Sequence, residues 1–138
     1  MIYVTKEVSI ANYMRPNEKT FPAGLPVERA NNLPPTSYWL CPFPDMPAQW
    51  REYGVMFVLS ELRSATDAEI NELPRAMIDR ILLAEDDSRL WPIRGKFNAT
   101  RRAIRKVRKL FPGILGLEYY LAVDAMITEI VNKGYKHD

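Results

Sequence analysis

Residues 94–109 read RGKFNATRRAIRKVRK, and this stretch holds eight basic residues and no acidic one. The chain of 138 residues has 19 Lys and Arg, so the other 122 positions carry eleven basic groups against all 17 acidic groups. Positive charge is therefore concentrated in one segment while the remainder is net acidic. Such an asymmetry indicates contact with a polyanionic partner.

The same stretch has the periodicity of an amphipathic helix, which we expect from about residue 98 to residue 111. At about 100° per residue, its apolar side chains fall within an arc of about 120°, the width typical of a helix that packs on a core. This arc contains Ala103, Ile104, Val107, Leu110 and Phe111. The opposite arc, called here the cationic face, contains Arg101, Arg102, Arg105, Lys106, Arg108 and Lys109.

Helical signals also lie on both sides of this helix. Residues 66–69 read Thr-Asp-Ala-Glu, a capping box that predicts a helix start, and Pro74 is expected to split that helix into two pieces, the second ending near residues 85–87. A last helix is expected over about residues 114–133, where Gly134 supplies the stop signal. Its predicted buried stripe contains Leu117, Tyr120, Leu121, Asp124, Ile127, Ile130 and Val131.

The first part of the chain has a different character. Residues 1–10 alternate between apolar and polar side chains and predict a strand, and residues 37–41 predict a second short strand that could pair with it. Eight of the eleven prolines lie between Pro16 and Pro47, so residues 11–36 are expected to be irregular. For residues 45–63 we favour a helix over the alternative of a buried strand at residues 53–60.

These elements predict a single α+β domain that is mostly helical. Residues 1–45 would supply a small β element and a proline-rich irregular segment, packed on four or five helices in residues 46–138. The composition is 47% hydrophobic and 26% charged, which is ordinary for a soluble domain. The single cysteine, Cys41, favours a reducing compartment, and no apolar run is long enough to cross a bilayer. We therefore expect a cytoplasmic protein that does not contact membranes.

The residues that support catalysis are nearly absent. The one histidine, His137, is next to the end of the sequence, and the six glycines form no phosphate-binding motif. We therefore expect no enzyme activity, no cofactor and no metal site. The alternative is a metal-dependent nuclease in which Glu85, Asp86 and Asp87 hold Mg²⁺ through carboxylate oxygens.

The favoured partner of the cationic face is a nucleic acid or a nucleoprotein complex, because phosphate contacts dominate such binding. Arg94 and Lys96 would extend the contact beyond the six residues of the cationic face. A second interpretation is a small inhibitor or adaptor, of the kind that a mobile element encodes, which binds an acidic protein surface. In a third, the chain neutralises its own cationic face with Asp67, Glu69, Glu72, Asp79, Glu85, Asp86 and Asp87.

Aromatic residues near the prolines suggest a second contact surface. Tyr38, Trp39 and Phe43 lie close together in the sequence, and tyrosine and tryptophan are favoured at interaction hot spots. The alternative is structural, with these rings and Trp50 anchoring the irregular segment to the rest of the fold.

Overall fold

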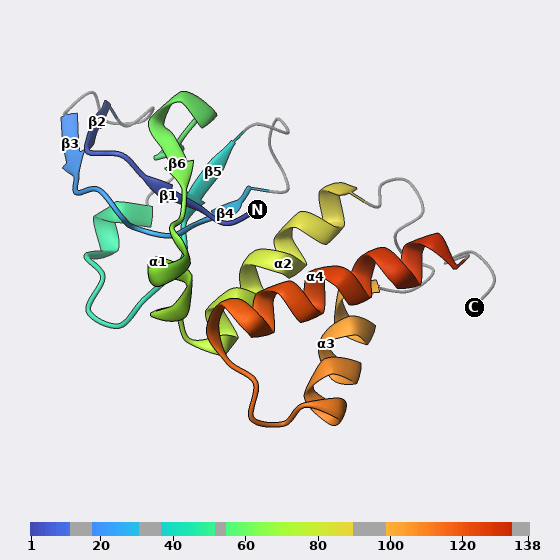
Figure 1. Cartoon of the computed structure of the whole chain (residues 1–138). Coiled ribbons are helices and arrows are strands. Elements are labelled where there is room, and N and C mark those ends of the chain that lie inside the picture. The colour runs from blue at the N-terminus through green and yellow to red at the C-terminus, as the bar shows by residue number, and fades with distance from the viewer. Residues whose placement is uncertain (12–17, 31–36, 52–54, 90–98, 134–138) are drawn as a thin grey trace. The chain divides into compact units, whose positions relative to one another are not determined.

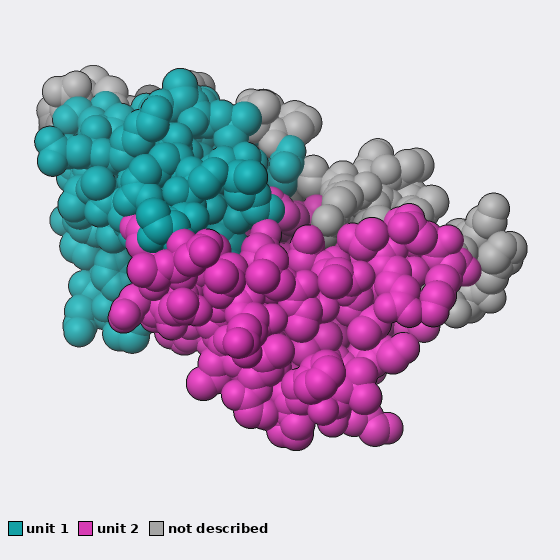
Figure 2. Space-filling model, viewed as in Figure 1, with its two compact units in different colours: residues 1–66 teal, residues 67–138 magenta. Residues whose placement is uncertain are grey.

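The computed structural model describes residues 1–11, 18–30, 37–51, 55–89 and 99–133 (Figure 1). The chain divides into two compact units, residues 1–66 and residues 67–138, which Figure 2 colours separately. About 50% of the structure is helical and 20% is strand. The prediction of a mostly helical domain is therefore wrong, since the strands of unit 1 make this a mixed α+β protein.

Unit 1 is built from three antiparallel pairs of short strands. The pairs are β1 with β6, β2 with β3, and β4 with β5. Two short 3-10 helices, η1 (Ala48–Arg51) and η2 (Leu59–Glu61), lie between β5 and β6. The strands are β1 (Tyr3–Thr5), β2 (Val8–Ala11), β3 (Glu18–Phe21), β4 (Val27–Arg29), β5 (Tyr38–Leu40) and β6 (Leu62–Ser64).

The N-terminal strand differs from the prediction in its extent and in its partner. It is interrupted at Lys6 and Glu7, and β1 pairs with β6 rather than with residues 37–41, which pair with β4. The segment predicted to be irregular contains both β3 and β4. Strands of three or four residues are too short to show a period of two, so tertiary contacts define them.

The hydroxyl group of Thr5 illustrates such a contact. It donates a hydrogen bond to the carbonyl oxygen of Pro22 at 2.7 Å and accepts one from the amide of Leu25 at 3.0 Å. Thr5 is fully buried, and the turn that it holds contains Gly24 at a φ of 91°. A buried side chain on β1 therefore fixes the turn that leads from β3 into β4.

The helix predicted for residues 45–63 is also wrong. Of the residues described in that range, only those of η1 and η2 are helical, and Phe57 is extended and pairs with Tyr38 through two backbone hydrogen bonds of 2.7 and 2.9 Å. This pairing is an isolated antiparallel bridge, and Val55 and Phe57 are buried while Met56 between them is only partly buried. The main core of unit 1 contains Phe21, Val27, Tyr38, Leu40, Val55, Phe57 and Leu62.

The helices described in unit 2 agree closely with the sequence prediction. They are α1 (Asp67–Asn71), α2 (Arg75–Arg89), α3 (Ala99–Leu110) and α4 (Gly116–Asn132). The predicted interruption at Pro74 is confirmed, because α1 ends before it and α2 begins directly after it. The buried apolar side chains are Ile70, Ile78, Ile81, Leu82, Ala99, Ala103, Ile104, Val107, Tyr119, Tyr120, Val123 and Ile127.

The start of α4 is fixed by a side chain of α1. Leu115, which precedes the helix, offers no side-chain cap, and the Oδ1 atom of Asn71 accepts a hydrogen bond from the Leu117 amide at 2.8 Å. Gly116 has a φ of +60°, and a Cβ atom there would lie 2.5 Å from Asn71 Oδ1. Only glycine fits this approach, so α1 and the turn after α3 together determine where α4 begins.

Candidate functional site

The packing of α3 decides which of its side chains can meet a partner. Its buried residues are Ala99, Thr100, Ala103, Ile104 and Val107, which recur at helical spacing along one side. Five of the six residues of the cationic face are exposed, and Arg102 is partly exposed. The predicted division of this helix into a buried side and a cationic side is thus confirmed for its first three turns.

The end of α3 departs from the predicted apolar arc. Leu110 and Phe111 were expected to pack on the core, but they are 55% and 54% exposed, and Leu115 in the following turn is 65% exposed. The predicted stripe of α4 is confirmed at Tyr120 and Ile127, which are buried, and is wrong at Leu121, which is exposed. It also omitted Tyr119 and Val123, which are both fully buried. The burial of Tyr119 places its hydroxyl group inside unit 2.

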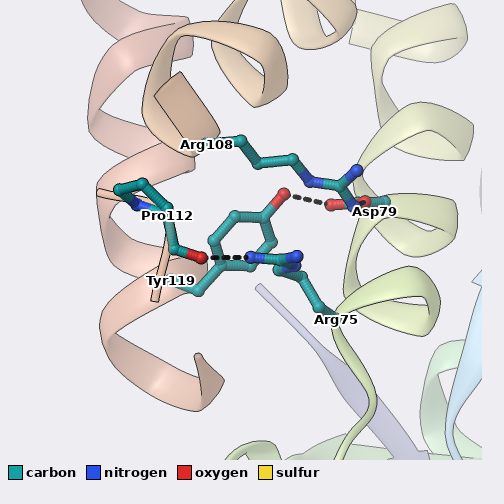
Figure 3. Close-up of polar contacts among 5 residues, drawn as sticks. All are labelled: Arg75, Asp79, Arg108, Pro112 and Tyr119. Atoms are coloured by element: carbon teal, nitrogen blue, oxygen red, sulfur yellow. Dashed lines mark hydrogen bonds and ion pairs between the residues drawn. The ribbon is translucent and has the colours of Figure 1, made fainter. Parts of the chain in front are cut away.

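That hydroxyl group belongs to a polar network between α2, α3 and α4 (Figure 3). It donates a hydrogen bond of 2.5 Å to Oδ1 of Asp79, and the guanidinium group of Arg108 forms an ion pair with Oδ2 of the same carboxylate. The side chain of Asp79 is 13% exposed and that of Arg108 is 42% exposed. Both oxygens of the carboxylate therefore have a partner, and one residue of the cationic face serves inside unit 2.

A second arginine, Arg75, also belongs to this network and lies against the ring of Tyr119. The guanidinium group of Arg75 lies 5.6 Å from the centre of the Tyr119 ring and donates a hydrogen bond of 3.2 Å to the carbonyl oxygen of Pro112 (Figure 3). Arg75 thus links the first turn of α2 to α4 and to the turn after α3. The roles of Arg75 and Tyr119 were not predicted from the sequence, because a helical pattern does not tell which polar side chains meet.

Burial and hydrogen bonding change the protonation of two members of this network. Burial, together with the hydrogen bond to Asp79, raises the pKa of Tyr119 to about 12. The hydrogen bond with Tyr119 and the negative charge of Asp79 raise the pKa of Arg108. Both groups therefore keep their protons through the neutral range.

The opposite edge of the cationic face lies near a carboxylate of α4. Glu129 forms an ion pair with Lys133 at 2.6 Å, and this hydrogen bond, the charge of Lys133 and the charge of Lys106 all lower the pKa of Glu129. One edge of the cationic face is thus paired with Asp79 through Arg108, and at the other edge the charge of Lys106 acts on Glu129.

The middle of the cationic face has a different environment. Arg105 and Lys109 are exposed, and neither forms an ion pair with another residue of the described ranges. Arg101 and Arg102 make further interactions within the chain. Among the described side chains of residues 67–87, Asp79 neutralises Arg108, and none forms an ion pair with Arg105 or Lys109.

Several predicted site residues lie outside the described part of the chain. These are Arg94 and Lys96, and the side chains of Asp86 and Asp87 are not described either. Among the residues that were searched, no group of three or more His, Cys, Asp or Glu side chains is arranged to hold a metal ion. Within the same residues, no helix has the length and apolar character needed to cross a membrane.

The three candidate aromatic residues occupy different environments in unit 1. Tyr38 is buried, and its ring meets that of Tyr3 edge to face at 5.7 Å between centroids. Phe43 is partly buried and packs against Trp50 at 6.3 Å, and Trp39 is partly buried with further contacts of its own. The structure thus uses Tyr38 in the core and does not gather the three rings into one exposed cluster.

Comparison with protein-family models, with curated proteins and with solved structures finds no significant match for this chain. A functional interpretation therefore depends on the chemistry and geometry of α3 and its surroundings.

Proposed function

We propose that this chain is a non-enzymatic binding protein whose unit 2 contacts nucleic acid through the cationic face of α3. The observation that carries the proposal is the environment of Arg105 and Lys109, which are exposed on a helix that contains no acidic residue. Like charges at i,i+4 positions, such as Arg101 and Arg105 or Arg105 and Lys109, destabilise a helix by a few tenths of a kcal/mol each. A bound polyanion would replace this repulsion between like charges with an attraction.

The dimensions of the cationic face suit a row of phosphates. Arg101 and Lys109 are eight residues apart, which corresponds to about 12 Å along the helix axis. Arginine and lysine on one helix face are a common means of phosphate contact, and such contacts give affinity without reading sequence. The proposed mechanism is charge neutralisation, with counterion release as the main driving force.

A salt titration of oligonucleotide binding tests this proposal. We expect the full chain to bind a labelled oligonucleotide at about 50 mM salt, and the logarithm of the affinity to fall linearly with the logarithm of the salt concentration. If about three phosphates are neutralised, the slope should lie between about −2 and −3. Absence of binding to both single-stranded and duplex probes at low salt would refute the proposal.

A second candidate function is supported by the exposed apolar side chains beside the cationic face. Leu110, Phe111 and Leu115 would suit a small inhibitor or adaptor that binds an acidic protein surface with apolar contacts at its edge. A protein partner should survive nuclease treatment in a capture experiment, and Phe111→Ser should weaken its binding. The same variant should leave oligonucleotide affinity unchanged if nucleic acid is the partner.

A further inference from the structure

A hollow of about 550 Å³ lies between α2 and α3, next to the cationic face. Asp79 and Leu83, one turn apart on α2, form one wall, and Arg101, Ile104 and Arg105 form the other. Residues three or four positions apart share a helix face, so the lining residues of each helix lie on one face of that helix. The hollow therefore combines an apolar base with two guanidinium groups.

The electrostatics of the hollow favour an anion despite the carboxylate in its wall. Both oxygens of Asp79 are already engaged, one by Arg108 and the other by the Tyr119 hydroxyl group. The charge of Asp79 is thus offset by Arg108, and Arg105, which is exposed and forms no ion pair within the described residues, is the charge offered to a ligand.

The apolar part of the hollow indicates more than a phosphate. Ile104 is 8% exposed and Leu83 is partly buried, so a ligand that covers them removes apolar surface from water. A phosphate gains nothing from such contact, whereas the face of a nucleobase does. Bases also stack on arginine guanidinium planes, and the volume falls within the range of sites for small organic groups.

We propose that this hollow seats an unpaired base of a single-stranded nucleic acid, with Arg105 stacked on the base and in contact with an adjoining phosphate. The inference rests on the proposed nucleic-acid function and adds the strand type to it. In a duplex each base is paired and covered by its neighbours, so its face cannot reach Leu83 and Ile104. A single strand exposes that face at little cost.

The test compares probes that carry the same number of phosphates. The full chain should bind a single-stranded oligonucleotide about fivefold more tightly than an abasic strand of equal length. This gain is smaller than aromatic stacking would give, since the lining residues that the structure describes are Asp79, Leu83, Arg101, Ile104 and Arg105. It should also prefer the single strand to a duplex. Equal binding of the base-bearing and the abasic single strand, or preference for the duplex, would overturn the inference while leaving the proposed function intact.

Two further outcomes keep the two proposals separate. Failure of every oligonucleotide to bind at low salt would remove the proposed function itself. Polyglutamate that binds as tightly as the single strand would instead indicate an acidic protein as partner and would overturn the inference.

Two variants locate the effect in the hollow. Leu83→Ser should abolish the preference for the base-bearing strand, while Leu121→Ser, at an exposed leucine of α4, should retain it. Arg105→Lys keeps the charge but loses the planar guanidinium group, so it should lower the preference with little change in affinity for the abasic strand. Because Arg105 is exposed, this variant tests the inference even if Leu83→Ser does not fold. Retention of the full preference in Arg105→Lys would contradict a stacked guanidinium group.

Discussion

Arg108 and Arg105 lie one turn apart on the same face of α3 and have different environments. Arg108 reaches α2, where it pairs with Asp79 and joins the buried Tyr119 hydroxyl group, whereas Arg105 is exposed and lines an open hollow. The difference shows that a uniformly basic helix face need not have one role. Its edge stabilises the packing of unit 2, and its middle remains available to a partner.

The largest effect on stability is expected at Asp79. Asp79→Ala removes the acceptor of a buried hydroxyl group and the partner of Arg108, so we expect a loss of about 2–3 kcal/mol in the free energy of unfolding. Chemical denaturation of the full chain measures this loss. Glu72→Ala, at an exposed acid that precedes Pro74, is the matched control and should cost less than about 0.5 kcal/mol. Equal effects of the two variants would mean that the network does not stabilise unit 2.

A smaller effect, dependent on pH, is expected at Tyr119. The pKa of this phenol is raised to about 12 in the folded chain, against about 10 in an unfolded one. Its contribution to stability is therefore complete below about pH 10 and is lost as the pH rises toward about 12, because the unfolded chain releases the proton first. The wild type should lose up to about 1 kcal/mol per pH unit more than Tyr119→Phe in this window.

Denaturation of both proteins at several values between about pH 8 and pH 11 would reveal this difference. Tyr3→Phe, in unit 1, is the matched control for the loss of one phenol. Parallel pH profiles for the wild type and Tyr119→Phe would show that the hydrogen bond to Asp79 does not hold the proton in solution.

The smallest effect on stability separates the two arginines directly. Arg108→Gln should cost up to about 1 kcal/mol, the usual upper value for a partly exposed ion pair, while Arg105→Gln should be neutral or slightly stabilising because it relieves like-charge repulsion. Thermal melts of the two single variants, which have the same net charge, provide the comparison. A lower melting temperature for Arg105→Gln than for Arg108→Gln would reverse our assignment of their roles.

The helices of unit 2 were predictable because their signals are local. The capping box at Thr66, the interruption at Pro74 and the apolar spacing of Ala103, Ile104 and Val107 each act within a few residues. The pairing of Asp79 with Arg108 was not predictable, although Asp79 belongs to the acidic set that the sequence singles out. Which of several acids meets which base depends on helix rotation and packing. Tyr119 was missed because the buried side of α4 includes it and Val123 beside the predicted Tyr120 and Ile127.

Unit 1 was predicted less well for a related reason. Its strands have three or four residues, and the partner of β1 lies about sixty positions away in β6, so local alternation carries little information. Phe57 was assigned to a helix because Trp50, Gly54 and Val58 have helical spacing with it, yet its backbone pairs with Tyr38. The exposure of Leu110 and Phe111 was missed because the apolar arc of α3 was assumed to be buried to its end.

The most direct test of the central claim compares two charge-neutralised variants. Arg105→Gln with Lys109→Gln removes two charges from the middle of the cationic face, and Lys6→Gln with Lys19→Gln removes two charges from unit 1. With a single-stranded probe, the first double variant should reduce the slope of log affinity against log salt by about 1.4, and the second should leave it unchanged. Equal slopes for the two double variants would contradict the claim that the middle of α3 binds phosphate.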